Sequence, residues 1–291
     1  MLIKVGFLLA YDYKLIEIAL PYLYPYADLI VFSIDKNRVS WVGNKYDFDE
    51  GFLTWLKAND PENKIKIYED DFHVPSLKPM ENESRQRNMM ASFMGDGGWH
   101  IQMDSDEYFY NFREFTDFLR SKKELLIHPE KHKIEIGAFL LNIYKKVEGG
   151  YLYIDESVET LGLATNYPSY TGRRSKHKVL YTPHYIFHQS WAREEPEIEF
   201  KIRNWGHSTD VDADAFYNAW RSLNVDNYKT VRNFHPINPK IWKSLAFIPG
   251  KDIPEFIRNF TAEKKMYVSP WTLFYKNLAQ KVIQLKRRLR S

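Results

Sequence analysis

The 291-residue sequence contains no cysteine. This absence excludes a disulfide framework, catalysis by a thiol and a metal site built from thiolates. A metal ion in this protein would therefore need oxygen or imidazole ligands. The sequence also lacks any apolar run near the roughly 20 residues that a membrane-spanning helix needs, so we expect a soluble protein.

We also expect no signal peptide, judging from the first residues of the sequence. The first residues, MLIKVGFLLAYDYK, begin with an apolar run, but Asp12 and Lys14 follow this run at once and no small-residue cleavage site appears. We interpret the segment as a buried first strand and expect a cytoplasmic protein.

An excess of charge of one sign is missing as well. The 41 Lys and Arg residues nearly balance the 38 Asp and Glu residues, which gives a net charge of +3. This balance argues against a general nucleic-acid binder, and we expect no nucleic-acid partner. Aromatic residues make up 16% of the chain, a content that suits stacking against bases or sugar rings.

The first hundred residues alternate between apolar runs and helical patterns. The runs predict strands at 3–10, 29–34, 64–68 and 99–103, with helices at 15–23, 48–57 and 81–94. Such alternation favours a mainly parallel sheet flanked by helices, in which ligands bind beyond the carboxyl ends of the strands. Asp12 and Asp35 follow the first two predicted strands.

The most informative segment is IQMDSDEYFY at 101–110, where Asp104, Asp106 and Glu107 end the fourth predicted strand. Carboxylates that are partly buried together repel one another unless a cation, an arginine or protons compensate them. We therefore expect this segment to be poorly ordered or repulsive when a cation and a diphosphate are both absent.

The order of motifs around this segment resembles the GT-A glycosyltransferases. The sequence ESRQRN at 83–88, a glycine turn at 95–98 and the strand ending in Asp104-Ser105-Asp106-Glu107 match the arginine-bearing helix, turn and DxD motif of that fold. The resemblance covers residues 1 to about 210. Within these glycosyltransferases, the sequence is most similar in pattern to the family 2 and family 17 enzymes. The resemblance implies a Rossmann-like α/β fold with a mixed, mainly parallel sheet and a nucleoside diphosphate sugar as the donor.

The resemblance also implies roles for the acidic segment and its neighbours. Asp106 would bind Mn²⁺ or Mg²⁺, and Asp104 would bind the same metal, the ribose or a metal-bound water. Ser105 would be the small residue that admits the diphosphate. Both metals prefer oxygen ligands, and a cation on the diphosphate stabilises the charge of the leaving group. Further residues that the resemblance assigns to the donor are Tyr11, Asp12, Asp35 and Arg87, and the alternative for Arg87 is that it pairs with the Asp104 cluster.

The second half should supply the acceptor side and a catalytic base. Residues 134–144 predict a strand, Gly149-Gly150 a hairpin turn and residues 151–154 the next strand. The resemblance implies a carboxylate here that deprotonates the acceptor hydroxyl. Two acidic pairs fit, and the sequence does not choose between them: Asp155 with Glu156, and Glu194 with Glu195.

Two histidines follow in the segments FHQSWAR at 187–193 and NWGHS at 204–208. A histidine in an apolar strand is commonly a core residue. The resemblance instead implies that His188 completes the metal shell, with His207 as the alternative. Arg193 and Lys201 lie between these two histidines, and we assign them no role.

The C-terminal segment has a different pattern. Trp271, Phe274, Leu278, Val282, Leu285 and Leu289 recur at helical spacing, six Lys and Arg residues surround them, and no acidic residue follows Glu263. This basic amphipathic helix predicts binding of residues 271–291 to an anionic membrane surface. The alternative is that the apolar stripe packs on the catalytic domain.

We therefore predict a GT-A catalytic domain at 1–245 and a helical extension at 246–291. Residues 1–110 would bind the nucleotide sugar and residues 111–245 the acceptor. The predicted activity is metal-dependent transfer of a hexosyl group to a glycan or lipid-linked glycan, with inversion, in the cytoplasm or on the inner face of a membrane. The alternatives are a sugar nucleotidyltransferase and a carbohydrate-binding protein with a vestigial site.

Overall fold

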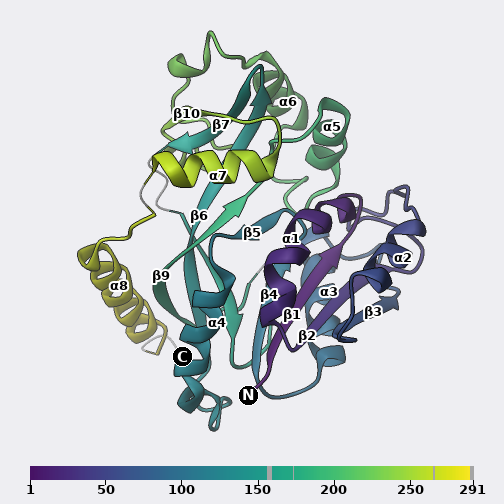
Figure 1. Ribbon diagram of the computed structural model, residues 1–291, viewed down its shortest axis with the longest axis vertical. Coiled ribbons are helices and arrows are strands. Elements are labelled where there is room, and N and C mark those ends of the chain that lie inside the picture. The colour runs from purple at the N-terminus through teal and green to yellow at the C-terminus, as the bar shows by residue number, and fades with distance from the viewer. Residues whose placement is uncertain (156–158, 173, 265, 289–291) are drawn as a thin grey trace.

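The computed structural model describes residues 1–155, 159–172, 174–264 and 266–288, and side chains as far as residue 284. Figure 1 shows a large mixed sheet with helices packed around it. The strands are β1 (Ile3–Leu9), β2 (Leu29–Asp35), β3 (Ile65–Asp70), β4 (Trp99–Asp104), β5 (Glu107–Phe109), β6 (Ile134–Val147), β7 (Gly150–Asp155), β8 (Thr160–Thr165), β9 (Lys178–His188) and β10 (Ser244–Pro249). The helices are α1 (Ile16–Leu23), α2 (Gly51–Ala58), α3 (Pro79–Met94), α4 (Phe112–Ser121), α5 (Glu195–Asn204), α6 (Ala213–Ser222), α7 (Ile253–Glu263) and α8 (Pro270–Arg288).

The first four strands form the parallel half of the sheet, in the order β4-β1-β2-β3. β1 pairs in parallel with β2 on one side and with β4 on the other. Because the chain leaves β1 for β2 and only later returns beside β1 as β4, the strand order reverses at this point. In such sheets the crevice at the reversal is the usual place for a ligand.

Helices cover both faces of the parallel half because β1 is apolar on both sides. Val5 and Phe7 belong to the main core with residues of α1 and α4, whereas Leu8 packs with Met90 and Met94 of α3 on the opposite face. A Cβ atom at Gly6 would lie 2.6 Å from Cε of Met90. The absence of a side chain at Gly6 therefore allows α3 to lie close against β1.

The remaining strands make the mixed half. β8 runs antiparallel to β4 and to β6, and β9 pairs in parallel with β6 and antiparallel with the short β5. β7 and β10 complete the edge, and Gly149 takes a φ of 77° in the turn between β6 and β7. α5 and α6 pack against each other beside this half, around a second core that contains Trp191, Ile198 and Trp220.

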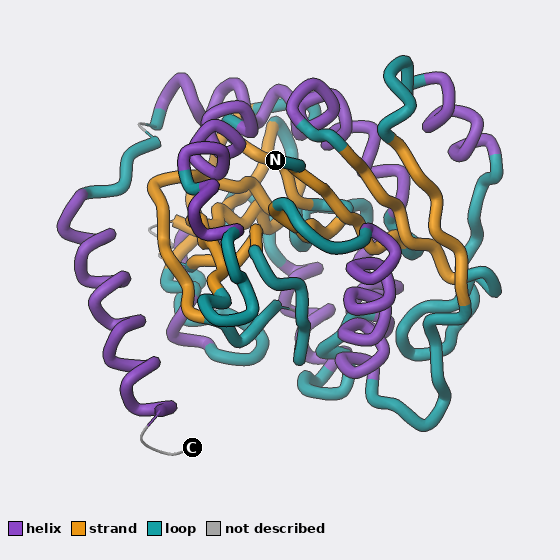
Figure 2. Tube along the Cα trace, turned by 90° about the horizontal axis from the view of Figure 1, so that it is seen from below, coloured by secondary structure: helices purple, strands orange, loops and turns teal. Residues whose placement is uncertain are grey.

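The predicted α/β fold with a mixed, mainly parallel sheet and flanking helices is confirmed, as are the predicted first four strands, three intervening helices and the β6–β7 hairpin. The domain division at residues 110 and 245 stays a prediction. Among the described helices, none combines the length and the apolar character needed to cross a bilayer. Figures 1 and 2 both show α8 at the outer edge of the molecule.

Candidate functional site

The candidate site lies at the carboxyl ends of β1 and β4, where the strand order reverses. A cavity of about 310 Å³ opens there, within the size range of small-molecule sites. Asp12 from the loop after β1, Glu83 from α3, and Asp104, Ser105 and Asp106 from the end of β4 all line it. Ser190 and Lys201, which follow β9, line it as well. The parallel half of the sheet and the segments after β9 therefore meet at one acidic cavity.

Arg87 compensates the first carboxylate of the DxD segment. Its guanidinium is fully buried on α3 and contacts Asp104 Oδ1 at 2.6 Å and Glu83 Oε1 at 2.8 Å, while Nη1 donates to Gln102. Burial lowers the pKa of Arg87, but Asp104 and Glu83 outweigh that effect and raise the pKa above its usual value. Arg87 therefore stays charged and holds two carboxylates of the cavity wall.

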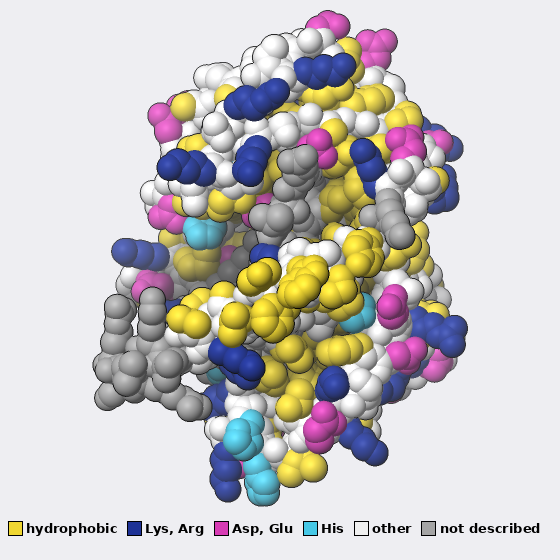
Figure 3. Space-filling view, turned by 90° about the vertical axis from the view of Figure 1, so that its left-hand side faces the viewer, with side chains coloured by type: hydrophobic (Ala, Val, Ile, Leu, Met, Phe, Trp, Pro, Cys, Tyr) yellow, Lys and Arg dark blue, Asp and Glu magenta, His cyan; other side chains and the backbone are white. Residues whose placement is uncertain are grey.

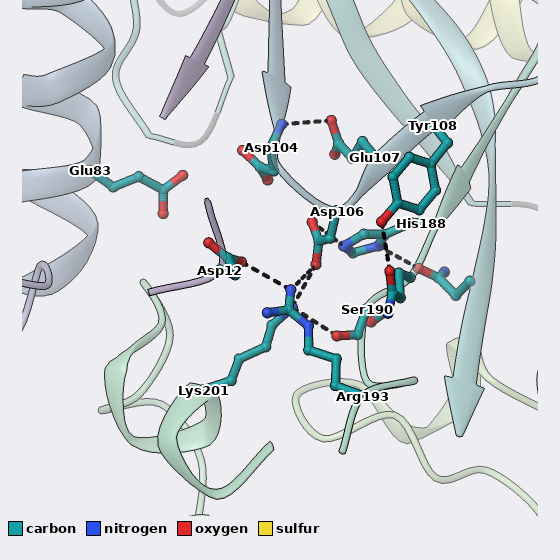
Figure 4. A network of polar contacts seen from close by, with 12 residues as sticks. Asp12, Glu83, Asp104, Asp106, Glu107, Tyr108, His188, Ser190, Arg193 and Lys201 are labelled. Atoms are coloured by element: carbon teal, nitrogen blue, oxygen red, sulfur yellow. Dashed lines mark hydrogen bonds and ion pairs between the residues drawn. The ribbon is translucent and has the colours of Figure 1, made fainter. Parts of the chain in front are cut away.

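Two further cations compensate Asp106. Its Oδ2 atom lies 2.5 Å from Nη2 of Arg193 and 2.7 Å from Nζ of Lys201, and Arg193 also contacts Asp12 at 3.0 Å. Figure 4 shows these two side chains meeting the same carboxylate oxygen. Burial alone would raise the pKa of Asp106, but Lys201, His188 and Arg193 hold the pKa well below its ordinary value.

The backbone after β9 brings these cations to Asp106. Glu107 of β5 pairs with His188 of β9, and the amide of Gln189 donates to the carbonyl of Asp106 at 2.9 Å. Ser190 then takes a φ of 43°, in the left-handed region that non-glycine residues seldom adopt. Its carbonyl accepts a hydrogen bond of 2.8 Å from Lys201 of α5. The turn and the helix together fix the lysine amine at the cavity wall.

His188 lies on the other side of the Asp106 carboxylate (Figure 4). Its Nε2 atom is 3.5 Å from Asp106 Oδ1, and its Nδ1 atom is 2.7 Å from Oδ1 of Asn142. Asn142 donates through its amide nitrogen to Glu159 at 2.6 Å, so its oxygen accepts from His188 Nδ1. The hydrogen-bond network thus turns Nε2 of His188 toward Asp106.

Asp106 and His188 form a donor set that suits a divalent cation. A carboxylate oxygen and an imidazole nitrogen are both ligands that Mn²⁺ accepts, and the two atoms face each other. Among the described residues no group of three or more ligating side chains converges. Two protein ligands fit a cation whose remaining ligands come from a bound phosphate and water. Binding of Mn²⁺ or Mg²⁺ stays a prediction.

The predicted repulsion within the acidic segment is wrong. Asp104 contacts Arg87, Asp106 contacts Arg193 and Lys201, and Glu107 contacts Arg174 at 3.0 Å. Because the chain bends between β4 and β5, the three carboxylates reach different cations. The protein itself therefore compensates the charge that the sequence places there.

The other predicted donor residues lie in two kinds of surroundings. Tyr11 and Asp12 line both the first cavity and a neighbouring one of about 330 Å³, which Tyr46 and Phe200 also line. Burial raises the pKa of the Tyr11 hydroxyl well above its usual value, with Asp12 adding to the effect. Asp35 is buried and accepts backbone hydrogen bonds from residues 37, 72 and 73. The structure thus gives Asp35 a role in joining two loops.

Of the predicted bases, Asp155, Glu194 and Glu195 are not among the described residues that line this cavity. Glu194 caps α5 and pairs with Lys146, and Glu195 pairs with Arg221; both carboxylates are exposed. Asp155 ends β7 beside β10, and Glu156 lies outside the described residues. The alternative metal ligand His207 lines the cavity, and its Nδ1 atom is 2.7 Å from Asp210.

Three residues that the sequence left without a role are prominent at the site: Arg193, Lys201 and Glu159. The clustered carboxylates called for cations, and both Arg193 and Lys201 stand in the segment between the two histidines, so that signal was present. Glu159 lines the cavity four residues after Asp155, but its sequence context carries no signal that distinguishes it from the neighbouring acids.

Comparisons with known proteins find only weak structural similarity. No model of a known protein family matches it, and no curated protein sequence does. Among solved structures, S. aureus TarS (residues 1–349) overlaps with a TM-score of 0.32 at 13% identity, covering 76% of this chain and 70% of that chain. The mannose-1-phosphate geranyltransferase from Thermus thermophilus overlaps with a TM-score of 0.29 at 10% identity, covering 77% of this chain and 69% of that chain. Overlaps this weak carry no argument about function.

Proposed function

We propose that the protein is a glycosyltransferase that moves a sugar from a nucleoside diphosphate sugar to a hydroxyl acceptor. The observation that carries the proposal is the surroundings of Asp106. This buried carboxylate lines a cavity beside the strand reversal and faces His188 on one side and the basic groups of Arg193 and Lys201 on the other. This arrangement combines groups that suit a cation with groups that suit phosphates.

In this proposal the cavity wall binds the diphosphate. Lys201 lines the cavity, and its amine lies between the carboxylate of Asp106 and the carbonyl of Ser190. Burial and the neighbouring Arg193 lower the pKa of Lys201, against the opposing effect of Asp106. Positive charge fixed at this position would favour the leaving diphosphate, whose negative charge grows as the glycosidic bond breaks.

A divalent cation, Mn²⁺ or Mg²⁺, would be held by Asp106 and His188 and would stabilise charge on the diphosphate oxygens. The protein's own contribution is to fix its two ligands before the donor arrives. Arg193 and Lys201 orient the Asp106 carboxylate, and Asn142 orients the His188 ring. Such outer partners commonly affect metal affinity by 10- to 100-fold.

Inversion at the anomeric carbon remains our expectation and rests on the resemblance to inverting families. The acceptor we propose is a glycan or lipid-linked glycan. Aromatic side chains on the cavity wall, Trp41, Trp191, Trp205 and Trp242, offer surfaces for sugar rings.

The proposal is tested by a thermal-shift panel of UDP, GDP, CMP and dTDP sugars with and without Mn²⁺. A ligand that binds the folded state raises its stability by about 2.7 kcal/mol at a concentration 100 times its Kd. We expect one nucleotide class to give a selective shift that Mn²⁺ enlarges, and sugar transfer with release of the nucleoside diphosphate. Release of pyrophosphate would indicate a nucleotidyltransferase, and no shift with any nucleotide would refute the proposal.

We also propose that α8 binds an anionic membrane surface, where a lipid-linked acceptor would lie. The structure packs α8 on β9 through polar side chains. Asn277 exchanges two hydrogen bonds with the backbone of Tyr181, at 2.8 and 3.0 Å, and the amine of Lys276 lies over the rings of Phe139 and Tyr181. This is not the packing of the apolar stripe that the alternative interpretation required.

The apolar side of α8 is therefore left at the surface. Trp271, Phe274, Tyr275, Leu278 and Val282 are between 43% and 70% exposed. Figure 3, which views the side of the molecule that carries α8, shows a band of hydrophobic side chains across its middle. The chain is basic from residue 264 onward, and each Lys or Arg near an anionic bilayer contributes about 1 kcal/mol of attraction. An anionic bilayer complements both properties.

Co-sedimentation with vesicles tests the membrane proposal. We expect binding to phosphatidylcholine vesicles that contain phosphatidylglycerol, weaker binding to pure phosphatidylcholine, and loss of binding in the Trp271→Glu/Phe274→Glu variant. The control variant Tyr22→Glu/Ile127→Glu carries the same charge change at two other exposed apolar residues and should bind normally. Equal loss in both variants would contradict the proposal, as would self-association through α8 without vesicle binding.

A further inference from the structure

Glu107 connects the two segments that carry the proposed metal ligands. Its backbone in β5 pairs with His188 of β9, and its Oε2 atom accepts a hydrogen bond of 3.1 Å from the backbone amide of Asp104 at the end of β4 (Figure 4). The carboxylate therefore closes the turn between β4 and β5, and this turn carries Ser105 and Asp106. A change at Glu107 would reach both this turn and the strand that presents His188.

Arg174 fixes the Glu107 carboxylate in this position. The Nη2 atom of Arg174 lies 3.0 Å from Oε1 and 3.2 Å from Oε2 of Glu107, so both oxygens contact the same nitrogen. The Glu107 side chain is fully buried, and that of Arg174 is 11% exposed. Hydrogen bonds between charged groups are shorter and stronger than those between neutral groups. The carboxylate is therefore held where it can accept from the Asp104 amide.

The segment that carries Arg174 is itself anchored to α3. Asn88 of α3 exchanges two hydrogen bonds with the backbone of Tyr170: its amide nitrogen donates to the carbonyl at 2.8 Å, and its oxygen accepts from the backbone amide at 2.9 Å. Asn88 directly follows Arg87, whose guanidinium contacts the Asp104 carboxylate. Helix α3 therefore holds Asp104 twice, directly through Arg87 and indirectly through the segment that carries Arg174.

The ion pair of Glu107 and Arg174 is not explained by stability alone. The cost of removing two charges from water can exceed their attraction, and apolar side chains of similar volume often stabilise a fold as well or better. An apolar side chain at position 107 would, however, offer no acceptor to the amide of Asp104. The ion pair thus supplies an oxygen in a fixed place, which an apolar pair would not.

We infer that Glu107 is a positioning residue of the donor site. It sets the backbone turn that carries Asp104 and Asp106, and Arg174 holds its carboxylate in place. The inference rests on the proposed glycosyltransferase function, in which this turn binds the cation and the diphosphate. Glu107 acts through the place of these ligand atoms and not through contact with the reacting atoms. A displacement of about 1 Å at such a site can lower a rate by about 100-fold.

Two variants of Glu107 test the inference. Each is titrated with UDP, GDP, CMP or dTDP, whichever the thermal-shift panel selects, with and without Mn²⁺. Glu107→Gln keeps an oxygen that can accept from Asp104, whereas Glu107→Leu removes it. Both variants remove the negative charge that faces Arg174, so both should lower the midpoint of urea unfolding by a similar amount. We expect Mn²⁺-dependent nucleotide binding to weaken by about 10- to 100-fold in Glu107→Leu, the usual effect of losing an outer partner of a metal site, and by less in Glu107→Gln.

A double variant separates positioning from support of the fold. Glu107→Leu/Arg174→Met removes both charges together and should recover much of the urea midpoint that Glu107→Leu loses. It should still bind the nucleotide as weakly as Glu107→Leu, because the acceptor for the Asp104 amide is missing in both. The matched control Arg203→Met/Asp214→Leu makes the corresponding change in a largely exposed pair at 2.7 Å and should bind the nucleotide as wild type does.

The outcomes distinguish this inference from the proposed function. If wild type binds the nucleotide with Mn²⁺ and Glu107→Leu binds it with equal affinity, Glu107 does not position the site and the proposed function stands. If nucleotide affinity follows the urea midpoint across the three variants, the ion pair only supports the fold and the inference is wrong. If wild type binds no nucleotide, the proposed function fails and the inference fails with it.

Discussion

Replacing Asp106 by Asn tests whether the buried charge network is organised around this carboxylate. The change keeps the shape of the side chain but leaves Arg193 and Lys201 facing a neutral amide in a site where Asp106 and Arg193 are buried. At an effective dielectric constant of 20, charges 2.7 Å apart attract by about 6 kcal/mol before the cost of removing them from water. Measured losses on breaking one partner of a buried pair are about 3–5 kcal/mol, and we expect Asp106→Asn to destabilise the fold by that amount at pH 7.

The assay is urea unfolding followed by tryptophan fluorescence. Asp214→Asn is a matched control, because Asp214 also contacts an arginine at 2.7 Å but both side chains are largely exposed; such pairs contribute about 0–1 kcal/mol. If the two variants lose the same free energy of unfolding, the buried network does not stabilise the fold as described.

The same variant predicts a pH dependence with a defined sign. The folded-state pKa of Asp106 is held well below its usual value, by Lys201, His188 and Arg193 acting against burial. An acid with a lowered folded-state pKa stabilises the protein above its unfolded-state pKa, about 3.9 for Asp, and this contribution is lost as pH falls through the folded-state pKa. The difference in stability between wild type and Asp106→Asn should therefore be constant near neutral pH and shrink below about pH 4.

Two further predictions concern the neighbours of Asp106. Arg87→Met should cost about 3–5 kcal/mol in urea unfolding, because it strands Glu83 and Asp104 without their cation, whereas Arg87→Lys should cost less but still weaken the site, since an ammonium cannot reproduce the planar fork; equal stability of Arg87→Met and wild type would contradict this. His188→Ala, or a chelator added to wild type, should remove the Mn²⁺-dependent part of the donor-induced thermal shift and leave the metal-free part, and a Mn²⁺ effect that survives in His188→Ala would exclude this histidine as a ligand.

The sequence predicted the parallel half of the fold well because its elements are local and strongly patterned. β1 reads as an apolar run that only Lys4 interrupts, as expected of a strand buried on both faces, and the helix with Met90 and Met94 follows the expected spacing. The long C-terminal helix was also predictable from its stripe. Its packing through polar side chains was not, because periodicity shows which face is apolar but not which face meets the protein.

The candidate site, like the fold, has contacts that the sequence predicted and contacts that it did not. Arg87 and Asp104 are 17 residues apart on adjacent elements, and the motif order anticipated their meeting. Lys201 reaches Asp106 across 95 residues, through a strand pairing and a left-handed turn that no local pattern specifies. The acid that faces the cavity depends on register: β6 shifts by one residue against both β7 and β8, and a shift of one residue exchanges the two faces of a strand. The sequence therefore offered two acidic pairs, Asp155 with Glu156 and Glu194 with Glu195, and did not single out Glu159 as an acid that lines the cavity.

The charges at the site imply an order in which its ligands bind. Five carboxylates, Asp12, Glu83, Asp104, Asp106 and Glu107, contact Arg87, Arg174, Arg193 and Lys201, and Glu159 adds a further carboxylate to the cavity wall. A diphosphate that arrives alone would meet these carboxylates, whereas a divalent cation held by Asp106 and His188 would attract it. The same cation would have only two protein ligands and would gain further ligands from the diphosphate oxygens. Because coupling between two ligands is reciprocal, we expect Mn²⁺ to bind weakly to the free protein and tightly once the nucleoside diphosphate is present, with the nucleotide gaining affinity by the same factor.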